Sequence, residues 1–118
     1  MEFNKICKYR VGQVAYLLDK LKTTTEGDKT LLDKTVVLWG SPMADANVHN
    51  HRRCPLVLLG HANGALKGNA HLKAADGTPM ANVMLTMLHQ LGLDDMKSFG
   101  DSTSEFSLSI PAATTAGA

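Results

Sequence analysis

Two stretches decide the fold: Thr35-Val36-Val37-Leu38-Trp39-Gly40 and Pro55-Leu56-Val57-Leu58-Leu59-Gly60. Each is short and almost wholly apolar, and the first is also β-branched and aromatic, which is typical of strands. Their unbroken apolar character further predicts strands that are buried on both faces. We therefore expect two neighbouring, buried strands joined by an irregular loop.

The fourteen residues between these strands, 41–54, are polar and show no helical period. Polar loops of this length are uncommon between buried strands unless they carry a function. The densest part reads Asp45-Ala46-Asn47-Val48-His49-Asn50-His51. It comes just after a buried strand, which is where α/β folds place their sites.

A helix is predicted over residues 6–22, where apolar side chains recur at three- and four-residue spacing. The polar stretch that follows contains Gly27 and ends this helix. Thr30-Leu31-Leu32-Asp33 has a capping-box-like spacing, which indicates one short helical turn. The apolar stripe of the first helix consists of Val11, Val14, Leu18 and Leu21.

A second helix is predicted to begin at Thr78-Pro79, with Thr78 as its cap and Pro79 in its first position. Gly92 is its natural end. Between the second strand and this helix, residues 61–77 indicate a loop that holds a short hairpin. The apolar stripe of the second helix consists of Val83, Met84, Met87, Leu88 and Leu91.

The resulting fold class is α/β, with two buried strands, flanking helices and a long polar loop. Two apolar strands need neighbours at their edges and cover on both faces. Two helices cannot supply this cover, so we expect the companion strands in sequence upstream of Met1. The chain is then expected to self-associate or to dock against that upstream portion.

The composition is that of an ordinary globular domain, with 118 residues of which 44% are hydrophobic and 19% charged. The formal net charge of +1 favours neither nucleic acid nor an anionic membrane as a partner. The apolar runs are too short to span a bilayer, and the first residues do not form a signal peptide. Two cysteines, Cys7 and Cys54, make no disulfide framework and are expected to be free thiols.

The polar loop contains candidate ligands for a divalent metal, because carboxylates and neutral imidazoles bind such ions. His49 and His51 lie two residues apart and share one side of an extended segment. Asp45 lies four residues before His49, which suits a helical turn instead, and the two geometries remain alternatives. His71 is a candidate fourth ligand for zinc, manganese or calcium.

The alternative interpretation is a polar loop whose side chains bond to their own backbone, as Asn and Asp commonly do. The neighbouring Arg52 and Arg53 are either donors to a bound anion or a solvated surface pair. Nothing in the sequence around His61 indicates a functional role, and His89 is interpreted as a half-exposed helix residue. The chain has no Gly-rich phosphate loop, no zinc-type cysteine pattern and no serine nucleophile motif.

At this loop the chain resembles the C-terminal region of the bacterial HXXSHH family, whose members are proteins of unknown function. The resemblance extends from the chain's start to about residue 104, which defines residues 1–104 as the family-like part and 105–118 as an extended or disordered tail. The segments that carry it are Trp39-Gly40-Ser41-x-Met43-x-Asp45-x-Asn47-x-His49-x-His51, Pro55–Gly60, Ala15–Lys22, Leu66-Lys67-Gly68 with His71, Gly77-Thr78-Pro79 and Ser98–Thr103.

The family is similar in fold to the alkaline phosphatase and sulfatase superfamily. This resemblance implies a central sheet between helices, with a metal site at the ends of strands. In that superfamily an acidic-histidine pair follows a strand, whereas Ser41-Pro42-Met43 stands there in this chain. Asp45, His49 and His51 are the nearest candidates, with His71 as the later histidine.

The HxxSHH motif itself does not occur in this chain and is expected upstream of Met1. Family members are several times longer and typically exported. We therefore expect a C-terminal piece of an alkaline-phosphatase-like sandwich that is inactive alone, whose full-length relatives hydrolyse phosphate or sulfate esters with a metal. The rival interpretation is a non-catalytic binding or assembly module.

Overall fold

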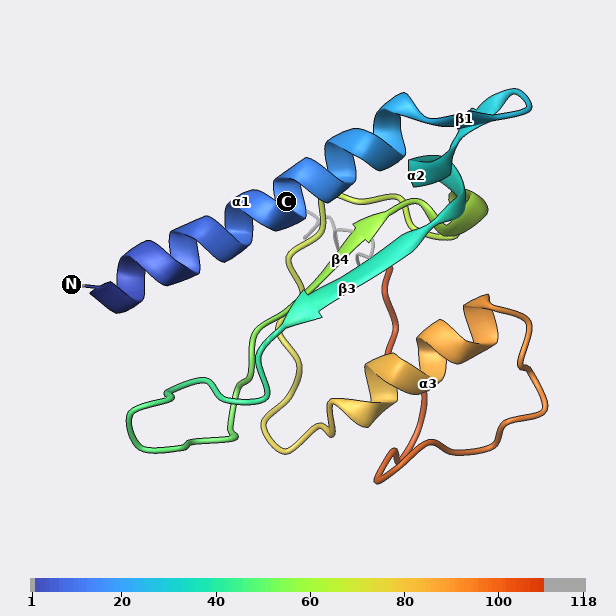
Figure 1. Ribbon diagram of the computed structural model, residues 1–118. Helices are drawn as coiled ribbons and strands as arrows, with labels where there is room; N and C mark the ends of the chain where they lie inside the picture. Colours follow the sequence, from blue (N-terminus) through green and yellow to red (C-terminus); the bar gives the residue numbers. More distant parts are fainter. Residues whose placement is uncertain (1, 110–118) are drawn as a thin grey trace, which may run out of the picture. The chain divides into compact units, whose positions relative to one another are not determined.

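The computed structural model describes residues 2–109 and contains both helices and strands (Figure 1). The chain divides into two compact units, one formed by residues up to Ser41 with Leu56–Gly68, the other by Pro42–Pro55 with the chain from Asn69 onward. The elements in order are α1 (Glu2–Thr23), β1 (Thr25–Glu26), β2 (Lys29–Thr30), α2 (Leu31–Lys34), β3 (Val36–Gly40), β4 (Leu56–Gly60), η1 (Ala62–Gly64) and α3 (Ala81–Gln90).

In the first unit β3 and β4 pair as antiparallel neighbours, drawn side by side in Figure 1. The register runs from Val36 opposite Gly60 to Gly40 opposite Leu56. The two predicted strands and their adjacency are therefore confirmed. A second antiparallel pair, β1 with β2, forms a small hairpin just after α1.

The expected burial of both strand faces is wrong. Trp39 and Val57, which lie opposite each other in the register, are each 40% exposed, and most other residues of the pair are half-buried. Among residues 2–109 Leu85, at 3% exposed, is the one hydrophobic residue that counts as buried. The apolar runs specify extended backbone, but within the described chain only two strands share this sheet, which leaves much of its surface uncovered.

Gly60 ends β4 in a backbone conformation that other residues avoid, with φ +102. A Cβ atom at this position would lie 2.2 Å from the carbonyl oxygen of Thr35. The next two amides continue this close approach, because His61 donates to the Leu32 carbonyl at 3.1 Å and Ala62 donates to the Thr35 carbonyl at 3.2 Å. Glycine is therefore required where β4 leaves the sheet against the α2–β3 junction.

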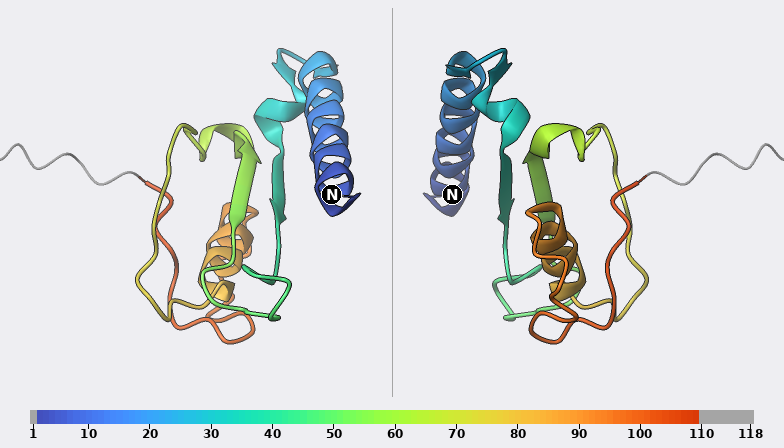
Figure 2. Two further views of the ribbon diagram at one scale, coloured as in Figure 1. Left: turned by 90° about the vertical axis from the view of Figure 1, so that its left-hand side faces the viewer. Right: turned by 90° about the vertical axis from the view of Figure 1, so that its right-hand side faces the viewer.

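The two N-terminal helices follow their sequence signals. The first predicted helix is confirmed as α1, although it begins earlier, and Val14, Leu18 and Leu21 form its half-buried stripe. The capping box before α2 is also confirmed: Thr30 and Asp33 each bond to the other's backbone amide. α2 contacts α1, β2, β4 and η1, and α1 runs beside β3 in Figure 2.

In the second unit α3 begins at Ala81, three residues after the predicted cap. The hydroxyl of Thr78 donates to the Ala75 carbonyl at 2.8 Å instead of capping the helix, so that prediction is wrong. The predicted end at Gly92 is confirmed. The amide of Gly92 donates to the His89 carbonyl and that of Leu93 to the Leu88 carbonyl, which is the bonding pattern of a Schellman motif.

The side of α3 that the structure buries differs from the predicted apolar stripe. Asn82, Leu85 and Thr86 are buried, whereas Leu91 of the predicted stripe is 66% exposed. The other four members of that stripe, Val83, Met84, Met87 and Leu88, are half-buried. At 100° per residue the buried set lies on the side opposite that stripe. This side is buried because Asn82 and Thr86 form hydrogen bonds with a segment near the C-terminus. A prediction from the spacing of apolar residues does not take such bonds into account.

The hairpin expected within residues 61–77 is absent, since this stretch holds η1 and irregular chain without a strand. Beyond Asp101 the described residues, up to 109, are also irregular. The rest of the predicted tail, 110–118, lies outside the described residues.

Candidate functional site

The histidine loop, Asp45–His51, is closed by an isolated antiparallel bridge between Asp45 and Asn50. The amide of Asn50 donates to the Asp45 carbonyl at 2.9 Å, and the amide of Ala44 donates to the Asn50 carbonyl at 2.8 Å. Residues 46–49 form the turn, in which His49 has φ +52. The loop is therefore a tight turn and not an extended segment.

Two side chains of the loop bond to its own backbone. Oδ1 of Asp45 accepts from the Asn47 amide at 2.9 Å, and Oδ1 of Asn50 accepts from the Arg52 amide at 2.8 Å. Such contacts are typical of Asx turns, which fold a loop without help from distant residues. They agree with the alternative interpretation, in which Asp45 and Asn50 have a structural role.

His51 is oriented by a backbone carbonyl, because its Nδ1 lies 2.8 Å from the Pro42 oxygen. A carbonyl oxygen only accepts hydrogen bonds, so Nδ1 carries the proton and Nε2 keeps its lone pair in the neutral ring. Metal-binding histidines commonly use this arrangement. The thiol of Cys54 also lies against the Pro42 oxygen, at 3.0 Å. Both Cys54 and Cys7 are free thiols, as predicted.

The four predicted metal ligands are all exposed: Asp45, His49, His51 and His71. Within residues 2–109 no three His, Cys, Asp or Glu side chains are grouped so that they could hold a metal ion. The described chain therefore does not bring these four residues together as one ligand set. His51 is the member whose ring is oriented as a ligand's would be.

Arg53, which follows the loop, is engaged with a carboxylate. Its Nε and Nη2 donate to the two carboxylate oxygens of Asp76 at 3.2 and 2.9 Å. This paired contact holds the pKa of the Asp76 carboxyl below its usual value and raises the pKa of Arg53. The guanidinium is therefore occupied by a side chain of its own unit rather than presented to an anion.

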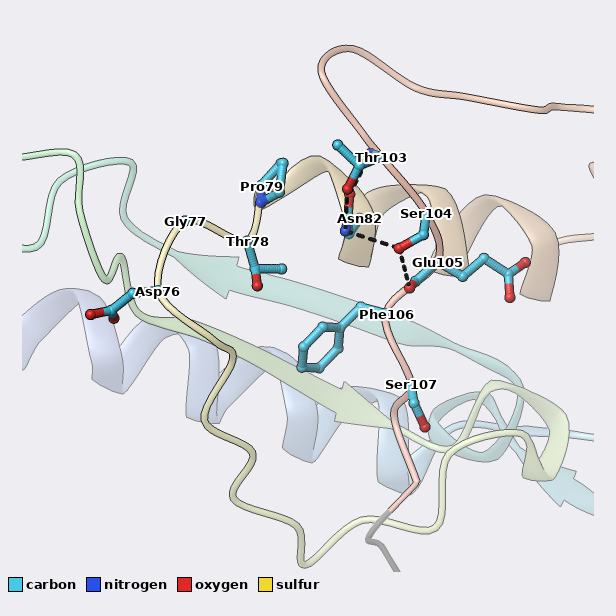
Figure 3. Close-up of a pocket in the computed structure, with 10 residues that line it drawn as sticks. All are labelled: Asp76, Gly77, Thr78, Pro79, Asn82, Thr103, Ser104, Glu105, Phe106 and Ser107. Carbon is cyan, nitrogen blue, oxygen red and sulfur yellow. Dashed lines mark hydrogen bonds between the residues drawn. The ribbon is translucent and has the colours of Figure 1, made fainter.

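A second cluster, which the sequence did not indicate, lies on α3. Asn82, only 4% exposed, accepts from the Thr103 amide at 2.9 Å through Oδ1. Its Nδ2 lies 3.3 Å from the Thr103 hydroxyl and 3.4 Å from the Ser104 hydroxyl (Figure 3). One side chain thus contacts the backbone and two side chains of the C-terminal segment.

Thr86, one turn further along α3, binds the same segment through its backbone. Its Oγ1 accepts from the Phe106 amide at 2.8 Å and lies 3.0 Å from the Phe106 carbonyl oxygen. The hydroxyl has a single hydrogen, for which the Phe106 carbonyl and the Asn82 carbonyl of α3 compete, each 3.0 Å away. Because Thr86 is buried, these bonds are shielded from competing water.

His89 completes this row on α3. Nδ1 contacts Oε1 of Glu105, and Nε2 lies 2.7 Å from the Met96 carbonyl oxygen. These contacts raise the pKa of His89 above its ordinary value, first through the Met96 carbonyl and then through Glu105. The signal in the sequence was the spacing of Asn82, Thr86 and His89, which places three polar residues on one side of the helix.

A shallow hollow lies beside this row, between the segment before α3 and the C-terminal segment (Figure 3). Its lining includes both polar and apolar residues, and none of the four predicted metal ligands contributes to it. The lining residues are Asp76, Gly77, Thr78, Pro79, Asn82, Thr103, Ser104, Glu105, Phe106 and Ser107.

None of the helices within residues 2–109 has the length and apolar character needed to cross a membrane. Comparisons with models of protein families, with curated proteins and with solved structures find no match to this chain.

Proposed function

We propose that this chain is a C-terminal portion of an HXXSHH-type, alkaline-phosphatase-like domain, and that it catalyses nothing by itself. The full-length reaction would be hydrolysis of a phosphate or sulfate ester, in which a divalent metal polarises the ester oxygen. The support is the resemblance of the loop and its flanks, together with the uncovered state of the β3–β4 pair.

The observation that carries this proposal is that β3 and β4 have sequences typical of buried strands, yet expose apolar side chains. Trp39 and Val57 are each 40% exposed on a sheet that has two strands in the described chain. Apolar strands of this kind normally have neighbours on their edges and cover on both faces. The proposed occupant of this space is the upstream portion of the same domain, whose strands would extend the sheet.

In this proposal the histidine loop contributes to the rim of a metal site in the whole domain. His51 supports that role best, since the Pro42 carbonyl fixes Nδ1 as a donor and leaves Nε2 to accept a metal. His49, Asp45 and His71 are the further proposed ligands. Zinc, manganese and calcium are the candidate ions.

Calorimetric titration of each ion into the wild-type chain and into a His49→Ala/His51→Ala variant tests the metal site. We expect weak binding by the wild type and none by the variant, because the variant lacks both imidazole ligands. A His61→Ala variant is the matched control, since His61 is another exposed histidine, and it should bind as the wild type does. Equal binding by the wild type and the double variant would show that His49 and His51 do not bind the metal.

Size-exclusion chromatography with light scattering tests the incomplete domain. We expect self-association of the isolated chain through its uncovered apolar side chains, and no turnover of aryl phosphate or aryl sulfate esters. A monomer that melts in one cooperative transition would contradict the proposal.

The second candidate function is a non-catalytic binding or assembly module. It is favoured by the bonds of Asp45 and Asn50 to the loop's own backbone, which give these residues a folding role. If a folded wild-type chain binds none of the three ions, this candidate replaces the first.

A further inference from the structure

α3 presents a row of three polar side chains to the C-terminal segment Thr103–Phe106. Asn82 and Thr86 bind its backbone, and His89 contacts Glu105. The first two are neutral, so their bonds do not change with pH in the neutral range. His89 is the member whose charge changes there.

The partners of His89 determine which form of the ring fits. Nε2 faces the Met96 carbonyl oxygen and Nδ1 faces a carboxylate oxygen of Glu105, and both of these atoms are acceptors when Glu105 is ionised. A neutral imidazole has one N–H and would turn a lone pair toward one of these oxygens. Only the imidazolium donates from both nitrogens, so the geometry fits the charged ring.

The surrounding charges act in the same direction. Glu105 on the segment and Asp94 in the turn after α3 are the ionisable groups that favour the positive ring, and α3 carries no other ionisable side chain. His89 also lies in the last turn of α3, where the helix dipole favours a cation. The His89 side chain is 20% exposed, and that of Glu105 is 56% exposed.

We propose that His89 is a pH-responsive clasp, closed as the imidazolium, that holds the segment Thr103–Phe106 on α3 and loosens its hold when the ring loses a proton. Opening uncovers the side of α3 on which Asn82, Leu85 and Thr86 are buried. The accessibility of that side then follows pH.

The direction of the pH effect follows from the raised pKa of His89. The contribution of the clasp is complete below the pKa of an unperturbed histidine, about 6.5, and is lost as pH rises through the higher value of the folded chain. The clasp is thus closed at pH 6 and weakened at pH 8.5.

Solvent-exchange NMR of the Phe106 amide tests the proposal, because this amide is bonded to Thr86. Protection is expressed relative to an unstructured peptide of the same sequence, which removes the intrinsic pH dependence of exchange. We expect protection to fall by roughly fivefold from pH 6 to pH 8.5, since a charged hydrogen bond is replaced by a weaker neutral contact. The His89 ring resonances should titrate with a midpoint above 6.5.

Two variants separate the clasp from general unfolding. His89→Gln removes the charge and Glu105→Gln removes its carboxylate partner, and each should weaken or abolish the pH dependence of Phe106 protection. Asp101→Asn, a control on an exposed acid before the segment, should keep the wild-type dependence. Protection of the α3 amides shows that the variants are folded, and if His89→Gln is not, Glu105→Gln decides alone. Equal wild-type protection at both pH values, or an unchanged dependence in a folded charge variant, overturns the proposal.

Discussion

The β3–β4 pair and the segment on α3 are held by different kinds of contact. The strands are held by main-chain pairing along the register from Val36–Gly60 to Gly40–Leu56. The segment is held largely by side chains of α3 that bond to its backbone. Main-chain pairing depends little on side-chain identity, whereas a contact of the second kind disappears with a single side chain. The two regions should therefore respond differently to substitution.

The largest expected effect tests Gly60, a position at which the strand pair depends on residue type. Gly60→Ala places a methyl group 2.2 Å from the Thr35 carbonyl oxygen at φ +102, so we expect a loss of roughly 3 kcal/mol of unfolding free energy. Denaturant unfolding measures this loss.

Gly64→Ala is the matched control, because Gly64 also has positive φ, +95, but no atom lies within 4 Å of the position that a Cβ would take there. It should cost roughly 1 kcal/mol from backbone strain alone. Equal losses in the two variants would mean that the close approach at Thr35 relaxes easily.

The next largest effect tests the contacts between α3 and the segment Thr103–Phe106. Asn82→Ala leaves the buried contact to the Thr103 amide without its acceptor, and we expect a loss of roughly 2 kcal/mol, with faster exchange of that amide. Unfolding and amide exchange are measured on the same sample. Gln90→Ala, an exposed position at the end of the same helix, should leave both quantities nearly unchanged. If Asn82→Ala is as stable as the wild type and its Thr103 amide stays protected, then contacts other than Asn82 hold the segment. The proposed difference between the two regions would then be wrong.

The smallest effect concerns a side-chain contact in the unit that contains the strands. Thr30→Ala removes half of the capping box of α2 and should cost roughly 1 kcal/mol. The Thr30 hydroxyl is also the main cause of the lowered pKa of Asp33, followed by the Thr30 backbone amide, so this pKa should rise toward its ordinary value in carboxyl NMR titrations.

The lowered pKa of Asp33 determines how the stability of the protein changes at acidic pH. A lowered pKa stabilises the fold above the ordinary aspartate value, about 3.9, and this contribution is lost as pH falls through the folded value. The variant should therefore lose less stability than the wild type on acidification. Parallel acid curves would show that the cap does not act through Asp33.

Local patterns predicted the elements whose causes are local. The apolar runs indicated both strands, the spacing of Thr30 and Asp33 indicated the cap, and Gly92 indicated the end of α3, all confirmed in the structure. The helix start at Thr78 was wrong because that hydroxyl binds the Ala75 carbonyl. The hairpin within residues 61–77 was wrong because glycine-rich sequence permits many loop conformations.

The two histidine regions show why the candidate site was harder to predict. The loop around His49 and His51 was conspicuous because its histidines lie two residues apart in sequence, and its four-ligand metal site remains a proposal. His89 was interpreted as a half-exposed helix residue, yet both of its ring nitrogens are engaged. Its partner Glu105 is sixteen residues away, in a segment without any period.

The sequence by itself determined the two strands, the C-terminal end of α3 and the capping box of α2, because hydrophobic runs, glycine and short-range hydrogen bonds act over a few residues. Only the tertiary structure decided which side of α3 is buried and which histidine carries two hydrogen-bond partners. Those outcomes depend on the return of the segment Thr103–Phe106 to Asn82 and Thr86. The spacing of Asn82, Thr86 and His89 places them on one side of α3, but the irregular segment about twenty positions away carries no matching signal. The effect of the contact on burial and charge is therefore seen only when both segments are placed in space.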